Sequence, residues 1–198
     1  MKTPKGRPSW RPFFVTLIIK TGVTMPSSPS PSLLNDLLDS WDRNNTILVN
    51  LLQALPDSAL QLKPVEGSPS IAGFFTHIHY VRLVFVAEDA PEFAPDVPKE
   101  EWAVDYDRGR IARMLNDSAK VVREAVRSRV ESGREMDVHY DYPILLLQHM
   151  LWHEGYHHGQ IKLTLKLAGQ PLANEEAGPQ TWGVWMRKNK RPAQTSLL

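Results

Sequence analysis

The chain has 198 residues, 42% of them hydrophobic, which is enough for one domain with a substantial core. Its formal net charge of +1 provides no general attraction for nucleic acid, and no basic stretch is interleaved with aromatic residues, so nucleic-acid binding is disfavoured. Because the chain has no cysteine, disulfides, thiolate metal sites and cysteine nucleophiles are excluded. This composition suits the cytoplasm, where we expect the protein to be located.

The first 24 residues carry five basic side chains, no acidic one and an apolar run from Phe13 to Ile19. This run is shorter than the roughly 20 apolar residues that span a bilayer, so we expect no membrane association. A signal peptide is disfavoured because Lys20 interrupts the run and no clear cleavage site follows. We expect residues 1–32, basic and then rich in proline and serine, to be a disordered arm, or residues 1–24 to be an over-extended translation start.

Four later segments have apolar residues three and four positions apart, as amphipathic helices do. Proline and glycine lie between these segments, where they end helices. The predicted helices are Leu33–Leu55, a segment capped by Ser70 with apolar positions from Phe74 to Phe85, Asp105–Val130, and Pro143–Ala168. No segment alternates with a period of two, so we predict an all-α fold, a four-helix bundle over residues 33–188, followed by a flexible tail at 189–198.

Two histidines on the last predicted helix suggest a metal site. His153 and His157 are four residues apart and therefore lie on one face of an α-helix. Both can turn a ring nitrogen toward one ion at about 2.0 to 2.1 Å. His158 is rotated by about 100° from His157 and should face elsewhere, whereas His149 lies one turn earlier on the same face and is a reserve candidate.

A metal site with an open position generally needs three protein ligands, so a third must come from another helix. His77 is the best donor because it lies on the apolar face of the second predicted helix. His79 lies about 200° away around that helix and should be solvated or at an interface. Three buried imidazoles could instead be ordinary hydrogen-bonded core residues, but one cation satisfies all their acceptor nitrogens together.

The pattern His-Glu-x-x-His, completed by Glu154, also occurs in zinc metalloproteases. The metzincin extension requires glycine and histidine where this chain has Gln160 and Leu163. A distal ligand could be Glu175 or Glu176, but both lie beyond the end of the predicted helix. With no strand to bind a substrate backbone, a protease is disfavoured. Glu154 is therefore interpreted as a carboxylate that hydrogen-bonds a metal ligand without touching the ion, or that lies on the surface.

Other side chains near these positions have more than one interpretation. Gln160 lies one turn beyond His157 and could orient a ligand ring or bound water, or simply cap the helix. Trp182 and Trp185 are predicted to cover an open end of the bundle, with substrate stacking as the alternative. Arg82 is predicted to pair with an acidic residue on a neighbouring helix.

Three segments of the sequence together resemble the DinB/YfiT-like family over roughly residues 33–188. The segments are Ser70-Ile-Ala-Gly-Phe-Phe-Thr-His77, His153-Glu-Gly-Tyr-His157-His-Gly-Gln160, and Trp182-Gly-Val-Trp185. The resemblance implies an up-down-down-up four-helix bundle, frequently a homodimer, that holds one metal ion. Carried over by position, the implied ligands are His77, His153 and His157. Many relatives have arginine where this chain has His158, which puts any anion-binding role of that position in doubt.

The resemblance also implies a class of chemistry. Relatives include transferases and isomerases that use low-molecular-weight thiols, so we expect a metal-dependent transferase or hydrolase that activates such a thiol, or water, against a small electrophile. The alternative is a non-catalytic module in which the metal staples two helices for dimerisation or sensing. We expect one divalent ion, with zinc as the first choice and nickel as the second, because imidazole suits both.

Overall fold

The computed structural model describes residues 31–94 and 96–187, and every regular element within these ranges is helical. The predicted arm lies outside the described residues except for its last two, which begin the first helix, and the predicted tail lies outside them entirely. No helix in the described part is both long and apolar enough to span a membrane. The four long helices are α1 (Pro31–Ala54), α2 (Ile71–Asp89), α3 (Arg108–Ser132) and α4 (Pro143–Leu167).

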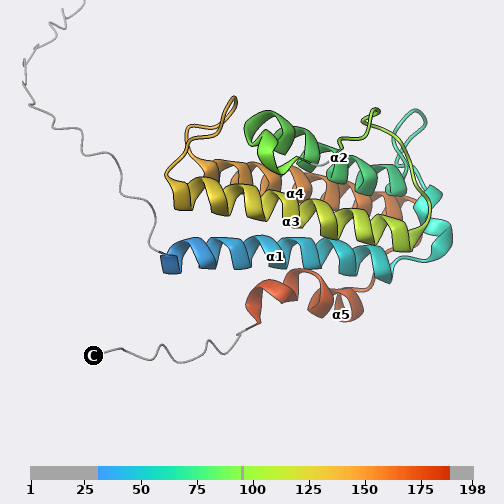
Figure 1. Ribbon diagram of the computed structural model, residues 1–198. Coiled ribbons are helices and arrows are strands. Elements are labelled where there is room, and N and C mark those ends of the chain that lie inside the picture. Colours follow the sequence, from blue (N-terminus) through green and yellow to red (C-terminus); the bar gives the residue numbers. More distant parts are fainter. Residues whose placement is uncertain (1–30, 95, 188–198) are drawn as a thin grey trace, which may run out of the picture.

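The four long helices pack side by side as a bundle (Figure 1). α1 and α4 run in one direction, whereas α2 and α3 run in the other (Figure 1). Because α2 and α3 are parallel, the chain has to return along the bundle between the end of α2 and the start of α3. The predicted all-α fold is therefore confirmed, and the helix directions in Figure 1 are those expected of an up-down-down-up bundle.

Local chemistry explains where the helices begin and end. The hydroxyl oxygen of Ser70 accepts a hydrogen bond from the backbone N–H of Gly73, which confirms the predicted N-cap of α2. Pro143 occupies the first turn of α4, where its missing N–H removes no helical hydrogen bond. Gly133 and Gly169 follow α3 and α4 with φ of 66° and 70°, a left-handed conformation that glycine adopts without strain.

The third helix begins later than predicted. The sequence pattern placed its start at Asp105, but α3 begins at Arg108 because the carboxylate of Asp107 accepts a hydrogen bond from the backbone N–H of Arg110 and caps the helix. Asp105 instead forms an ion pair with the Arg110 side chain in front of the helix. The predicted start was too early because two aspartates, Asp105 and Asp107, precede the apolar pattern and either could serve as the cap.

The core has two apolar clusters with a polar layer between them. One cluster surrounds Phe75 and Leu51, and the other surrounds Trp41 and Val126. The layer between them consists of buried polar side chains from all four long helices. They are Asn44 and Asn45 of α1, Arg82 of α2, Ser118 of α3 and Glu154 of α4.

The segment after α4 packs along the side of α1. It contains the short helix α5 (Asn174–Ala177) and two 3₁₀ helices, η3 (Gly178–Gln180) and η4 (Trp182–Met186). The guanidinium of Arg43 in α1 donates hydrogen bonds to the carbonyls of Val184 and Arg187, which fixes η4 against this helix. The prediction that Trp182 and Trp185 cover an open end of the bundle is therefore wrong: both lie beside α1 and remain about half exposed.

Candidate metal centre

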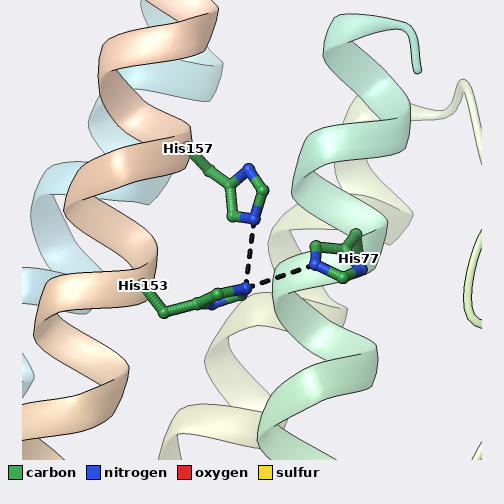
Figure 2. A group of neighbouring side chains, drawn as sticks. All are labelled: His77, His153 and His157. Atoms are coloured by element: carbon green, nitrogen blue, oxygen red, sulfur yellow. Dashed lines mark hydrogen bonds between the residues drawn. The ribbon is translucent and has the colours of Figure 1, made fainter. Parts of the chain in front are cut away.

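Three histidine side chains from two helices converge at the face where α2 meets α4. His77 extends from α2, and His153 and His157 extend from successive turns of α4 (Figure 2). The Nε2 atom of His153 lies 3.2 Å from Nε2 of His77 and 3.1 Å from Nε2 of His157. His77 and His157 are buried, and His153 is half-buried. The structure thus brings together the three histidines that helical spacing selected.

The three rings have too few protons for a hydrogen bond at each of their nitrogen–nitrogen contacts. The Nδ1 atom of His157 lies 2.7 Å from Oε1 of Gln160, so Nδ1–H donates and Nε2 is left as an acceptor. A neutral His153 carries at most one proton on Nε2, yet this atom contacts the Nε2 atoms of both other rings. One of the two Nε2–Nε2 contacts therefore has no proton with which to form a hydrogen bond. A cation between the rings would satisfy all three nitrogens.

The spacing of the nitrogens fits a shared ion. A tetrahedral zinc ion with nitrogen ligands at about 2.05 Å places neighbouring ligand atoms about 3.3 Å apart. The two measured separations of 3.2 and 3.1 Å lie close to this value, and one ring nitrogen from each histidine falls within 4.8 Å of the others. The spacing of the three residues therefore suits a shared metal ion.

The environment keeps these imidazoles neutral, which is the form that binds metal. Burial, followed by the repulsion of His157, lowers the pKa of His77 from 6.5 to about 4. Burial and the neighbouring histidines lower the pKa of His153 to about 3. Burial also lowers the pKa of His157, against the opposing effect of its hydrogen bond to Gln160. Near neutral pH all three rings therefore offer lone pairs.

Gln160 holds the His157 ring in the orientation that the site requires. Its amide oxygen accepts from Nδ1 of His157, and its amide nitrogen donates to the hydroxyl of Tyr156, 3.0 Å away. The amide is therefore held from both ends. This is the ring-orienting arrangement considered from the sequence, and it directs Nε2 of His157 toward the cluster.

The segment between α2 and α3 also contributes to the site. The indole of Trp102 stacks on the His77 ring, with centroids 4.1 Å apart and planes 4° apart. Oε1 of Glu101 lies 3.3 Å from Nδ1 of His77. Neither Glu101 nor Trp102 was predicted from the sequence to lie near the histidines. The only available signal was a tryptophan next to a carboxylate in a polar loop.

Glu154 faces away from the three histidines and into the polar layer. Its carboxylate accepts two hydrogen bonds from Arg82, at 2.6 and 2.8 Å, and both side chains are fully buried. Asn44 also donates to it. The prediction for Arg82 is confirmed. The interpretation of Glu154 as a surface carboxylate or as one supporting a ligand is corrected, because its carboxylate is bound by Arg82 and Asn44.

The remaining histidines of these helices have other partners. The ring of His149 shares a 2.7 Å hydrogen bond through Nδ1 with the hydroxyl of Tyr140, and it does not join the cluster. His79 donates from Nδ1 to the carbonyl of Met114 in α3 and so lies at a helix–helix interface, one of its two predicted locations. Burial lowers the pKa of His158, which lies outside the cluster as predicted.

Comparison with known proteins agrees with this fold. A DinB-like protein from Bacillus cereus, known from its crystal structure, matches with a TM-score of 0.54 at 19% sequence identity, over 68% of this chain and 92% of that chain. No curated protein matches the chain. The model of the DinB family matches residues 28–178, which is more than half of the sequence. The chain therefore belongs to the DinB family.

Proposed function

We propose that His77, His153 and His157 bind one divalent metal ion, and that this centre belongs to a metal-dependent transferase or hydrolase. The observation that carries the proposal is the convergence of three Nε2 atoms at 3.1 and 3.2 Å with too few protons to satisfy them. Imidazole ligands suit zinc as the first choice and nickel as the second. The bound ion would lower the pKa of a coordinated water or thiol and so supply a nucleophile near neutral pH.

The absence of a fourth nearby ligand favours a reactive centre over a structural one. A structural zinc site is closed by four protein ligands, whereas a catalytic site keeps a position open. The two candidates for closure are engaged elsewhere: Glu154 pairs with Arg82, and His149 with Tyr140. Within residues 31–94 and 96–187, the group able to hold an ion contains three residues only. A metal that merely staples α2 to α4 is therefore the less favoured alternative.

The chain's own residues would serve binding and positioning. Gln160 fixes the tautomer of His157, and the low pKa values of His77 and His153 keep their rings unprotonated at pH 7. Trp102 covers one face of the His77 ring and limits the approach of water from that side. The proposed substrate class, a small electrophile attacked by a low-molecular-weight thiol or by water, rests on the family resemblance.

The proposal is tested by preparing the protein without an affinity tag, measuring its metal content, and recording the visible spectrum of the cobalt-substituted form. We expect one ion per chain and a change in the cobalt spectrum when a low-molecular-weight thiol is added, because an open position admits a sulfur ligand. A His153→Ala variant should show neither. Wild-type protein that binds no metal contradicts the centre, and a spectrum that thiols leave unchanged contradicts the thiol-transfer branch.

The family resemblance further leads us to propose a homodimer. Light scattering of the purified protein measures this directly: a mass near twice the 22.5 kDa chain supports the dimer, and a mass near that of one chain contradicts it. The metal centre itself uses residues of a single chain, so it does not depend on the oligomeric state.

A further inference from the structure

The three rings of the candidate centre differ in what holds their outer nitrogen. Nδ1 of His157 donates to Gln160, and Nδ1 of His153 is buried without a hydrogen-bond partner. Nδ1 of His77 is also buried and makes no hydrogen bond, but Oε1 of Glu101 lies 3.3 Å from it. His77 therefore has a carboxylate at ion-pair distance that is not yet in hydrogen-bonding geometry.

The position of this carboxylate follows from how the α2–α3 connection rests on α2. Trp102 stacks on the His77 ring with nearly parallel planes. One turn earlier in α2, Gly73 has no side chain, and a Cβ there would lie 3.7 Å from Cγ2 of Val104. The connection thus contacts α2 at two successive turns, and Glu101 is held beside Nδ1 by the residue that follows it in sequence.

We propose that Glu101 is a positioning residue for His77, and that metal binding draws its carboxylate into a hydrogen bond with Nδ1–H of this ring. The inference rests on the proposed metal centre. When an ion occupies Nε2, the proton of a neutral imidazole must be on Nδ1, where Glu101 is the nearest acceptor. Trp102 keeps the ring and the carboxylate together by stacking.

Two physical effects make this contact useful. A carboxylate that accepts from the outer nitrogen fixes the tautomer and the orientation of a metal-binding histidine, and it raises the basicity of the ligand atom. It also brings a negative charge near a dication that otherwise has three neutral ligands. Because the Glu101 side chain is 48% exposed, solvent screens part of this attraction, and we expect an effect at the lower end of those known for such partners.

The main experiment measures metal affinity by calorimetry, with zinc and nickel titrated into metal-free wild-type protein and three variants. Glu101→Ala removes the acceptor and should weaken binding about tenfold. Glu101→Gln keeps an amide oxygen without the charge and should lie between Glu101→Ala and wild type. Glu100→Ala is the matched control, because Glu100 is an exposed carboxylate one residue away.

Two further measurements separate positioning from a general effect on folding. In zinc-loaded protein, the NMR signal of the His77 Nδ1 proton should be protected from exchange in wild type and should lose this protection in Glu101→Ala. The urea midpoint of the metal-free protein should be the same in both, because the Glu101 contact is exposed and not yet formed. Trp102→Phe should keep the wild-type metal affinity, whereas Trp102→Ala should lower it toward that of Glu101→Ala.

The outcomes distinguish this inference from the function on which it rests. Wild-type protein that binds neither metal overturns the centre itself. Wild-type protein that binds metal with the same affinity as Glu101→Ala overturns the role of Glu101 and leaves the centre standing. Equal losses in Glu101→Ala and Glu100→Ala also overturn it, because they show a nonspecific charge effect.

Discussion

Two neighbouring residues of α4, His153 and Glu154, face two polar regions that differ in one respect. Glu154 enters a network in which each carboxylate oxygen has a donor. The paired guanidinium of Arg82 also donates to Asn45, Ser118 and the Leu115 carbonyl. His153 enters a cluster in which nitrogens face one another with too few protons between them. The first polar region is satisfied by its own residues, whereas the second could be satisfied by a cation.

This difference separates a structural network from a site. A buried polar group without a partner costs free energy, so natural folds keep such groups mainly where a ligand completes them. A fully satisfied network gives no such indication, even when its residues match a catalytic motif. Glu154 belongs to a sequence pattern shared with metalloproteases, but its hydrogen bonds assign it to the bundle interior.

The largest expected effect is on the network. Glu154→Ala leaves the Arg82 guanidinium buried without its carboxylate, and we expect it to lower the free energy of unfolding by about 3–5 kcal/mol, measured by urea denaturation. Asp39→Ala is the control, because it removes an exposed partner of Arg43 and should cost less than about 1 kcal/mol. The double variant Arg82→Met/Glu154→Leu should be more stable than Glu154→Ala. A loss below 1 kcal/mol in Glu154→Ala would show that the network is not needed.

The next effect concerns the histidine cluster, where we expect a large loss of metal affinity and only a small loss of stability. His153→Ala should weaken zinc binding by more than about a hundredfold, since a direct ligand contributes more than the orienting partners around it. The stability of the metal-free protein should change much less than in Glu154→Ala, because the Nδ1 atom of His153 makes no hydrogen bond. His158→Ala, on the same helix but outside the cluster, is the matched control. If both histidine variants bind zinc like wild type, the cluster is not the metal site.

The smallest effect is the response of the metal-free protein to pH. His77 and His153 have pKa values of about 4 and about 3 in the folded protein, against 6.5 for the ordinary side chain. Between pH 6.5 and about 4 the unfolded chain therefore binds protons that the folded chain does not, and stability falls as the pH falls. Well above pH 6.5 neither state is protonated at these residues, so they contribute no slope.

Thermal unfolding of the metal-free protein at pH 7.5, 6 and 5 measures this slope. The variant His77→Ala/His153→Ala should have a shallower decrease in Tm over the same range, while His157 and His158, whose pKa values burial also lowers, retain part of it. A variant with the same slope as wild type would show that the two rings are not protected from protonation in the fold.

Helical periodicity is the reason that the bundle and the three histidines could be predicted. A spacing of four residues reports a shared helix face directly, so His153 and His157 were paired from the sequence, and the apolar neighbours of His77 placed it inward. Arg82 was predicted to pair with an acidic residue on another helix, but the partner was not identified. That choice depends on the rotation of α4 against α2, which the sequence of either helix does not contain.

Irregular segments carry no such signal. Glu101 and Trp102 lie 24 and 25 residues after His77, in a connection without periodicity, and only the return path of that connection brings them to the site. Trp182 and Trp185 were misplaced for the same reason: the hydrogen bonds of Arg43 to backbone carbonyls fix η4 beside α1, and such contacts leave no pattern in the sequence.

The position of Arg82 also bears on how the bundle assembles. Its guanidinium, carried by α2, reaches Asn45 of α1, the Leu115 carbonyl of α3 and Glu154 of α4, so one side chain contacts every long helix. In an intermediate with only three of the helices docked, this charge would be partly desolvated and incompletely paired. Partly assembled forms are thereby penalised, and the four helices should join in a single cooperative transition rather than one at a time.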